Sequence, residues 1–120
     1  MAFIKFDIVN FHMDVSFEDF KKLDIRVGRV NDIQDIEGSK NLIKLIVDFG
    51  NEKRQAVAGL KSHYSKEDII DKEFVFVLNL ERKKFMGEES QCMILAADDE
   101  NGNIVLLQPQ KDINIGSKIR

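Results

Sequence analysis

The chain has 120 residues, of which 43% are hydrophobic and 32% are charged. This composition favours one globular domain with its own core over a disordered chain or a two-domain protein. The single cysteine excludes an intramolecular disulfide and a cysteine-rich zinc site, and no apolar run approaches the roughly 20 residues of a membrane-spanning helix. Because the formal net charge is −3, any binding of nucleic acid must come from a local basic patch.

The first fifteen residues are strongly apolar and alternate as a strand does. Ile4, Phe6 and Ile8 share one side, and the alternation shifts by one residue from Val9 onward. A free tail of this kind would expose many hydrophobic side chains to water. We therefore expect residues 1–15 to form an N-terminal arm that packs on the barrel or on a dimer partner, and residues 16–120 to form the domain proper.

The next segments predict a short helix and a long strand. Ser16 is a suitable N-cap for a helix over residues 17–22. A strand then starts at Leu23 and extends to about Ile36. Its apolar phase changes after Gly28, which predicts a bulge or a sharp bend at that glycine.

The remainder of the chain predicts further strands and one more helical turn. Ser65 caps the turn, which separates the third strand from the fourth. The strands follow one another with polar turns between them, at residues 42–49, 53–58, 74–78, 91–97 and 104–107. Five main strands with a short helix between the third and the fourth are typical of an OB-fold, a five-stranded Greek-key barrel. The predicted fold class is therefore all-β with a small α content, plus N- and C-terminal extensions.

Three segments together resemble the stand-alone tRNA-binding domain family, which also occurs at the C-terminus of many methionyl-tRNA synthetases and in the endothelial-monocyte-activating cytokine. They read LDIRVGRV at residues 23–30, LIVDFG at residues 45–50 and NLERKKFMGEESQCMILA at residues 79–96. The resemblance implies an OB-fold, usually a homodimer, that binds tRNA by its shape. It also implies dimerisation near the N- and C-terminal segments and suggests an aminoacyl-tRNA synthetase as a further partner.

A related bacterial branch, the CsaA-type protein-export chaperones, shares this fold and dimer, so a chaperone that binds unfolded polypeptides is the alternative function. The chain departs from the family pattern at three places. Glu81-Arg82 replaces a lysine-proline pair, Cys92 replaces a glycine, and the loop at residues 36–41 has no proline. These departures affect the expected shapes of both loops.

Arg82, Lys83 and Lys84 form the densest basic cluster, and we expect it on the loop before the last barrel strand. In OB-folds this loop borders the face that binds nucleic acid. Phosphate oxygens accept hydrogen bonds from cationic N–H groups, so these three side chains are the leading candidates for RNA contacts. Lys84 also matches the second lysine of the family motif.

Ser90, Asn79 and Arg26 are further candidate RNA contacts that also have a structural interpretation. Ser90 matches the motif serine, and its hydroxyl is equally suited to bind RNA or to satisfy the loop backbone. Asn79 either fixes the loop or contacts RNA, and the structural role is favoured. Arg26 and Arg29 flank Gly28, so one can join the basic face while the other pairs with an acid.

The sequence contains no set of residues that indicates an enzyme, a metal site or a cofactor site. Nine phenylalanines are present, but those in the strands are in core phase, so no platform for stacking bases is evident. With no secretory signal visible, we expect a cytoplasmic protein that does not bind membranes. Its predicted function is a non-enzymatic homodimer that recognises folded tRNA by shape and phosphate contacts.

Overall fold

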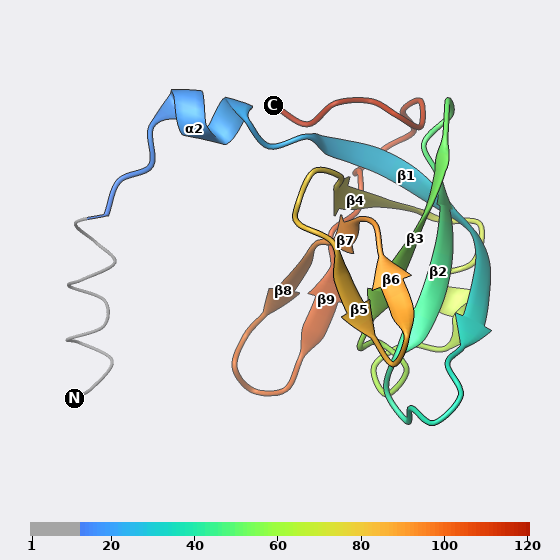
Figure 1. Cartoon of the computed structure of the whole chain (residues 1–120). Helices are drawn as coiled ribbons and strands as arrows, with labels where there is room; N and C mark the ends of the chain where they lie inside the picture. Colours follow the sequence, from blue (N-terminus) through green and yellow to red (C-terminus); the bar gives the residue numbers. More distant parts are fainter. Residues whose placement is uncertain (1–12) are drawn as a thin grey trace.

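The computed structural model describes residues 13–120, so most of the predicted apolar arm, residues 1–12, lies outside the described residues. The predicted helix is confirmed as α2 (Phe17–Lys21), and the Oγ of Ser16 caps it by accepting a hydrogen bond from the Asp19 amide at 3.1 Å. No residue of α2 is buried, and Figure 1 shows the helix standing away from the barrel.

Five antiparallel strands form the barrel in the order β3-β2-β1-β4-β7 (Figure 1). Their bounds are β1 (Ile25–Asp35), β2 (Ile43–Asp48), β3 (Lys53–Ala58), β4 (Glu73–Val77) and β7 (Met93–Ile94). The two ends of the sheet meet where the Gln91 amide donates to the Gln55 carbonyl at 2.8 Å. A 3₁₀ turn, η1 (Lys66–Asp68), lies between β3 and β4. This arrangement confirms the predicted five-stranded barrel with a short helical turn between its third and fourth strands.

β1 contributes to both halves of the barrel, as its length suggests. Its first part pairs with β4 and its second part pairs with β2. The sequence predicted a bulge or a sharp bend at Gly28, and the structure places the bulge two residues later, between Val30 and Asp32. The glycine is required for a different reason. A Cβ at Gly28 would lie 2.6 Å from side-chain atoms of both Val47 and Phe49.

The core follows from the alternation of β2. Ile43, Leu45, Val47 and Phe49 are all buried, while the residues between them are half-buried. Phe49 meets Phe76 of β4 edge to face, with ring centroids 5.5 Å apart. Alternate side chains of one strand therefore fill the barrel interior, as the sequence pattern predicts.

Two small hairpins lie outside the five-stranded sheet. The first was not predicted, whereas the second agrees with the predicted polar turn between the strands at residues 91–97 and 104–107. The first, β5 (Lys83–Phe85) with β6 (Glu88–Ser90), occupies the segment that the sequence suggested was a loop. Met86 and Gly87 both have positive φ, at 53° and 84°, which is the backbone of a two-residue hairpin turn. The second consists of β8 (Ala96–Asp98) and β9 (Ile104–Leu106). The predicted strand at residues 91–97 is therefore divided between the barrel strand β7 and the separate strand β8.

The C-terminal segment returns to the start of β1. The Gly116 amide donates to the Val27 carbonyl at 2.7 Å, and the Ile119 amide donates to the Ile25 carbonyl at 2.8 Å. Within the described range, neither α2 nor η1 has the length of a helix that could cross a membrane.

Candidate nucleic-acid interface

The hairpin that carries the basic cluster is fixed to the barrel through β6. The amide side chain of Gln55 donates to the Glu89 carbonyl at 2.6 Å, and the ammonium of Lys44 lies 3.3 Å from the Glu88 carboxylate. Because these contacts hold β6, the paired strand β5 is presented on a fixed support rather than on a free loop.

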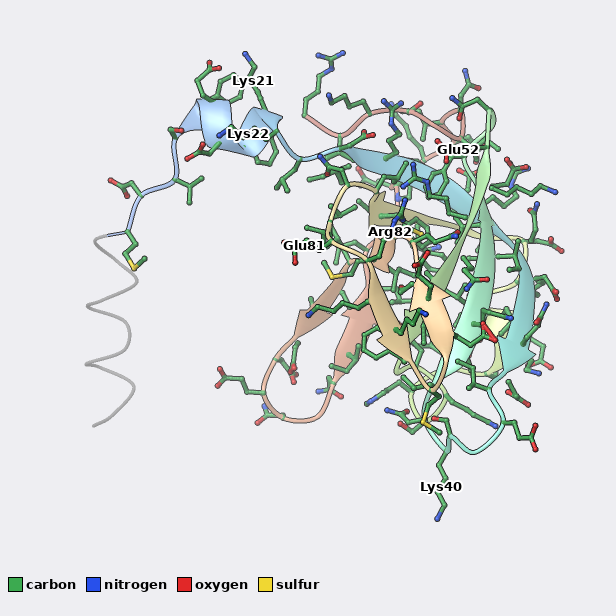
Figure 2. All side chains as sticks on the ribbon, in the orientation of Figure 1. Lys21, Lys22, Lys40, Glu52, Glu81 and Arg82 are labelled. Carbon is green, nitrogen blue, oxygen red and sulfur yellow. The ribbon has the colours of Figure 1, made fainter. Side chains whose placement is uncertain are left out.

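The three cations of the cluster are exposed, and among residues 13–120 none of them forms an ion pair. Arg82, the first of the three, is labelled in Figure 2. Arg82 donates to the carbonyl of Gln91. Glu89 pairs with Lys84 in the β5–β6 register. The cluster is therefore free to accept an external anion, although a carboxylate lies across from one of its members.

Strand alternation divides the cluster between two surfaces. Lys83 and Phe85 line a groove beside the hairpin, whereas Lys84 does not line it and points to the other face of β5. The sequence suggested a single basic loop, and the structure places the two lysines back to back. Lys84 is therefore the cation of β5 that can contact a ligand on the outer face.

Ser90 makes two internal hydrogen bonds, which fit the structural one of the two roles that the sequence left open. Its hydroxyl oxygen accepts a hydrogen bond from the Val57 amide and its proton is donated to the Cys92 carbonyl, both at 3.0 Å. The side chain is also half-buried. These contacts join the hairpin to β3 and to the residue before β7, so Ser90 helps to position the cluster.

The two arginines of β1 both pair with acids. The Nε of Arg26 lies 2.7 Å from Asp24, and its Nη1 donates to the Gly116 carbonyl at 3.0 Å. Arg29 bonds to Glu73 at 2.8 Å, and this contact raises the pKa of its guanidinium. Arg26 therefore links β1 to the C-terminal segment, and neither arginine carries a charge without a partner.

Asn79 ties the helix–strand junction to the start of the basic segment. Its Oδ1 accepts from the Asp24 amide at 2.8 Å, and its Nδ2 donates to the Lys22 carbonyl at 2.6 Å. We predict that Asn79→Ala lowers the free energy of unfolding by about 1–2 kcal/mol, because it removes two hydrogen bonds. Amide hydrogen exchange should accelerate most at residues 22–24. Asn101→Ala, which changes the exposed β8–β9 turn, is the matched control and should leave those amides unchanged.

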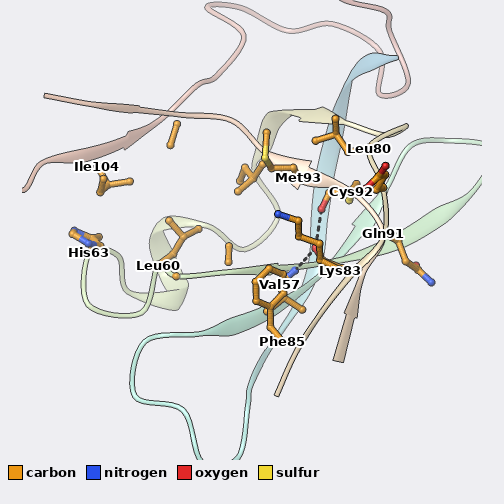
Figure 3. A pocket seen from close by; sticks show the side chains of 16 residues that line it. Val57, Leu60, His63, Leu80, Lys83, Phe85, Gln91, Cys92, Met93 and Ile104 are labelled. Carbon is orange, nitrogen blue, oxygen red and sulfur yellow. Dashed lines mark hydrogen bonds between the residues drawn. The ribbon is translucent and has the colours of Figure 1, made fainter. Parts of the chain in front are cut away.

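The groove beside the hairpin was not predicted. It has a volume of about 720 Å³ and is lined by the ends of several strands (Figure 3). Three large hydrophobic side chains on its walls, Leu80, Phe85 and Met93, are exposed. No local pattern predicts the groove, because these residues come from segments that are separate in the chain.

Cys92 lies at the groove, and burial raises the pKa of its thiol to about 12. The thiol is therefore protonated at neutral pH and is a poor nucleophile. Residues 13–120 contain no group of three or more His, Cys, Asp or Glu side chains that could hold a metal ion.

A family model described as "Putative tRNA binding domain" matches residues 25–118. Curated relatives include the methionine–tRNA ligases of Thermococcus onnurineus, 52% identical over 106 residues, and of Methanocaldococcus jannaschii, 47% identical over 108 residues. These matches cover 88% and 90% of this chain but only 14% and 16% of the ligases. The chain thus spans about a seventh of the length of the curated relatives it matches.

Solved structures match over almost the whole described chain. A MetRS-related protein from Pyrococcus horikoshii superposes with a TM-score of 0.84 at 38% identity. The chaperone CsaA from Bacillus anthracis str. Ames superposes with a TM-score of 0.82 at 34% identity. Each match covers 90% of this chain and 100% of the other. This chain is therefore similar to both proteins over their full extent.

Proposed function

Because the chain belongs to the tRNA-binding domain family, we propose that it binds tRNA and has no catalytic activity of its own. The matched range, residues 25–118, includes the whole barrel and both hairpins. The ligases that it resembles have most of their length outside the match, so their enzymatic activity is not transferred to this chain. A cytoplasmic location and association with an aminoacyl-tRNA synthetase follow as parts of the same proposal.

The observation that carries the proposal is the exposed basic cluster on a hairpin that is fixed to the barrel. Arg82 and Lys84 offer cationic N–H donors to phosphate oxygens. Lys83 adds a third positive charge from the groove side of the same strand. Because the hairpin is held in place, little conformational entropy is lost when these side chains meet RNA.

Recognition by shape is favoured over the reading of splayed bases. Stacking of bases needs several aromatic rings on one open surface. Of the described aromatic residues, Phe49, Phe74 and Phe76 are buried, and the Tyr64 hydroxyl accepts a hydrogen bond from the Leu106 amide. Phe17 and Phe20 are exposed, but they stack on each other on α2, which lies outside the matched range. Phe85 lines the groove rather than the outer face of β5. Contacts to the phosphate backbone of folded tRNA are therefore the proposed mode of binding.

We further propose that the protein is a homodimer. Met13, Val15 and Phe17 are exposed on the segment that stands away from the barrel, and a two-fold interface would bury such side chains. Two copies would present two basic hairpins to one tRNA, which compensates for the negative net charge of each chain. Sedimentation equilibrium tests this part directly, and a mass of one chain at micromolar concentration would contradict it.

A filter-binding titration with total tRNA at two salt concentrations tests the function. We expect tight binding at low salt and a steep loss at higher salt, because each phosphate contact releases bound counterions. Bovine serum albumin, which is also acidic, serves as the control for retention of tRNA by an acidic protein. Absence of tRNA binding at low salt would contradict the proposal.

The groove supports a second candidate function. It is mostly apolar and large enough for several side chains, and the chain is similar to the chaperone CsaA. A CsaA-like protein that binds unfolded polypeptides would use this groove rather than Lys84. If the protein does not bind tRNA at low salt but binds reduced, unfolded polypeptides, this second function replaces the first.

A further inference from the structure

The groove has an unused strand edge along one wall. β5 pairs with β6 on one side, and among residues 13–120 no backbone hydrogen bond is made to its other edge. Unpaired edges of this kind accept an added strand, and an adjacent apolar groove receives alternate side chains of that strand. Figure 3 shows Lys83 and Phe85 extending into the groove from β5. The site is therefore suited to an extended, alternating apolar segment.

We propose that the chain's own N-terminal arm, residues 3–11, occupies this groove as an added strand beside β5. The arm is the segment of this sequence with the required pattern. Ile4, Phe6 and Ile8 lie on one side of an extended backbone, and Lys5 and Asp7 lie on the other. The three apolar side chains would enter the groove, and the two charged side chains would remain in water.

The arm can reach the groove within the same molecule. The bond between Asn79 and the Lys22 carbonyl fixes the base of the N-terminal segment next to Leu80, which is a wall of the groove. Phe6 lies eleven residue steps before Phe17, and this stretch spans up to about 36 Å when extended. The two smaller dimensions of the molecule are 32 and 29 Å. Chain length therefore permits docking in cis.

The apolar side chains that are exposed at the groove agree with this occupant. The occupant shields the exposed Leu80, Phe85 and Met93 from water. This proposal does not depend on tRNA binding, because Lys84 lies on the opposite face of β5.

Disulfide trapping in the full chain tests the proposal. Cys92→Ala removes the native thiol, and Phe6→Cys is then combined with Leu80→Cys in the groove wall. The control pair combines Phe6→Cys with Val105→Cys, which is exposed on β9 and, by alternation with the groove residue Ile104, points away from the groove. Mild oxidation should give an intrachain disulfide in most molecules of the Leu80 pair and in few molecules of the Val105 pair.

Two results of this experiment would overturn the proposal. Equal intrachain yields for the two pairs would show that the arm has no preferred site. A disulfide-linked dimer as the main product of the Leu80 pair would show that a second copy, not the same chain, fills the groove.

Binding of the apolar dye 8-anilinonaphthalene-1-sulfonate gives an independent readout in the chain that retains Cys92. Phe6→Asp should release the arm and raise dye fluorescence several-fold, while Lys5→Asp, on the other side of the same strand, should leave it at the wild-type level. Equal fluorescence of Phe6→Asp and wild type would contradict the proposal, and circular dichroism verifies that both variants are folded.

Discussion

Lys84→Glu is expected to lower the affinity for tRNA by roughly 30-fold at low salt, which corresponds to about 2 kcal/mol. The substitution removes a cationic donor from the outer face of β5 and places a second carboxylate beside Glu89, its partner across the hairpin. The first change removes an attraction for phosphate, and the second adds a repulsion. Lys84→Ala removes only the contact, so it should weaken binding less and lower the salt slope by about one unit.

Filter binding over a range of salt concentrations measures both effects, and Lys111→Glu is the matched control. Lys111 is exposed, forms no ion pair with a described residue, and lies on the C-terminal segment away from the hairpin. Lys83→Glu makes the same charge change on the groove side of β5 and should reduce affinity less than Lys84→Glu. If Lys84→Glu and Lys111→Glu weaken binding equally, net charge rather than the basic hairpin determines the affinity.

Gly28→Ala is expected to destabilise the fold by about 1–3 kcal/mol, and Gly28→Val by at least as much. The added Cβ would lie 2.6 Å from side-chain atoms of Val47 and Phe49, which are 0% and 2% exposed and cannot move into open space. Urea unfolding followed by circular dichroism measures the loss as a lower midpoint with an unchanged slope.

A double-mutant cycle identifies the cause of that loss. Val47→Ala removes one of the two clashing atoms, so Gly28→Ala should cost less in the Val47→Ala background than in the wild type. Strict additivity of the two substitutions would indicate that the glycine is needed for its backbone conformation and not for the close approach of these side chains.

The barrel was predictable where one face of a strand is buried and the other is not. The alternation of residues 43–49 places four side chains in the core, and Ser16 marks the start of α2 through a local contact. The β5–β6 hairpin left almost no signal, because its strands are three residues long and mostly charged. The division between β7 and β8 was also hidden, since an unbroken apolar run does not show where a strand changes its partner.

The roles of the site residues depended on contacts between distant parts of the chain. Asn79 bonds to the backbone of Lys22 and Asp24, more than fifty residues away, and Ser90 bonds to Val57 across 33 residues. No local pattern encodes such partners. The sequence identified the segment that carries the basic cluster, but only the coordinates distinguish the side chains that brace it from those that remain free.

Because Lys83 and Lys84 point to opposite faces of β5, this short strand borders both the groove and the outer face that carries Lys84. A strand added to the open edge of β5 would reduce the thermal motion of β5. Lys84 would then be held closer to the position in which it contacts phosphate. Occupation of the groove is therefore expected to raise the affinity of the outer face for RNA through reduced motion alone, without a change in the mean structure.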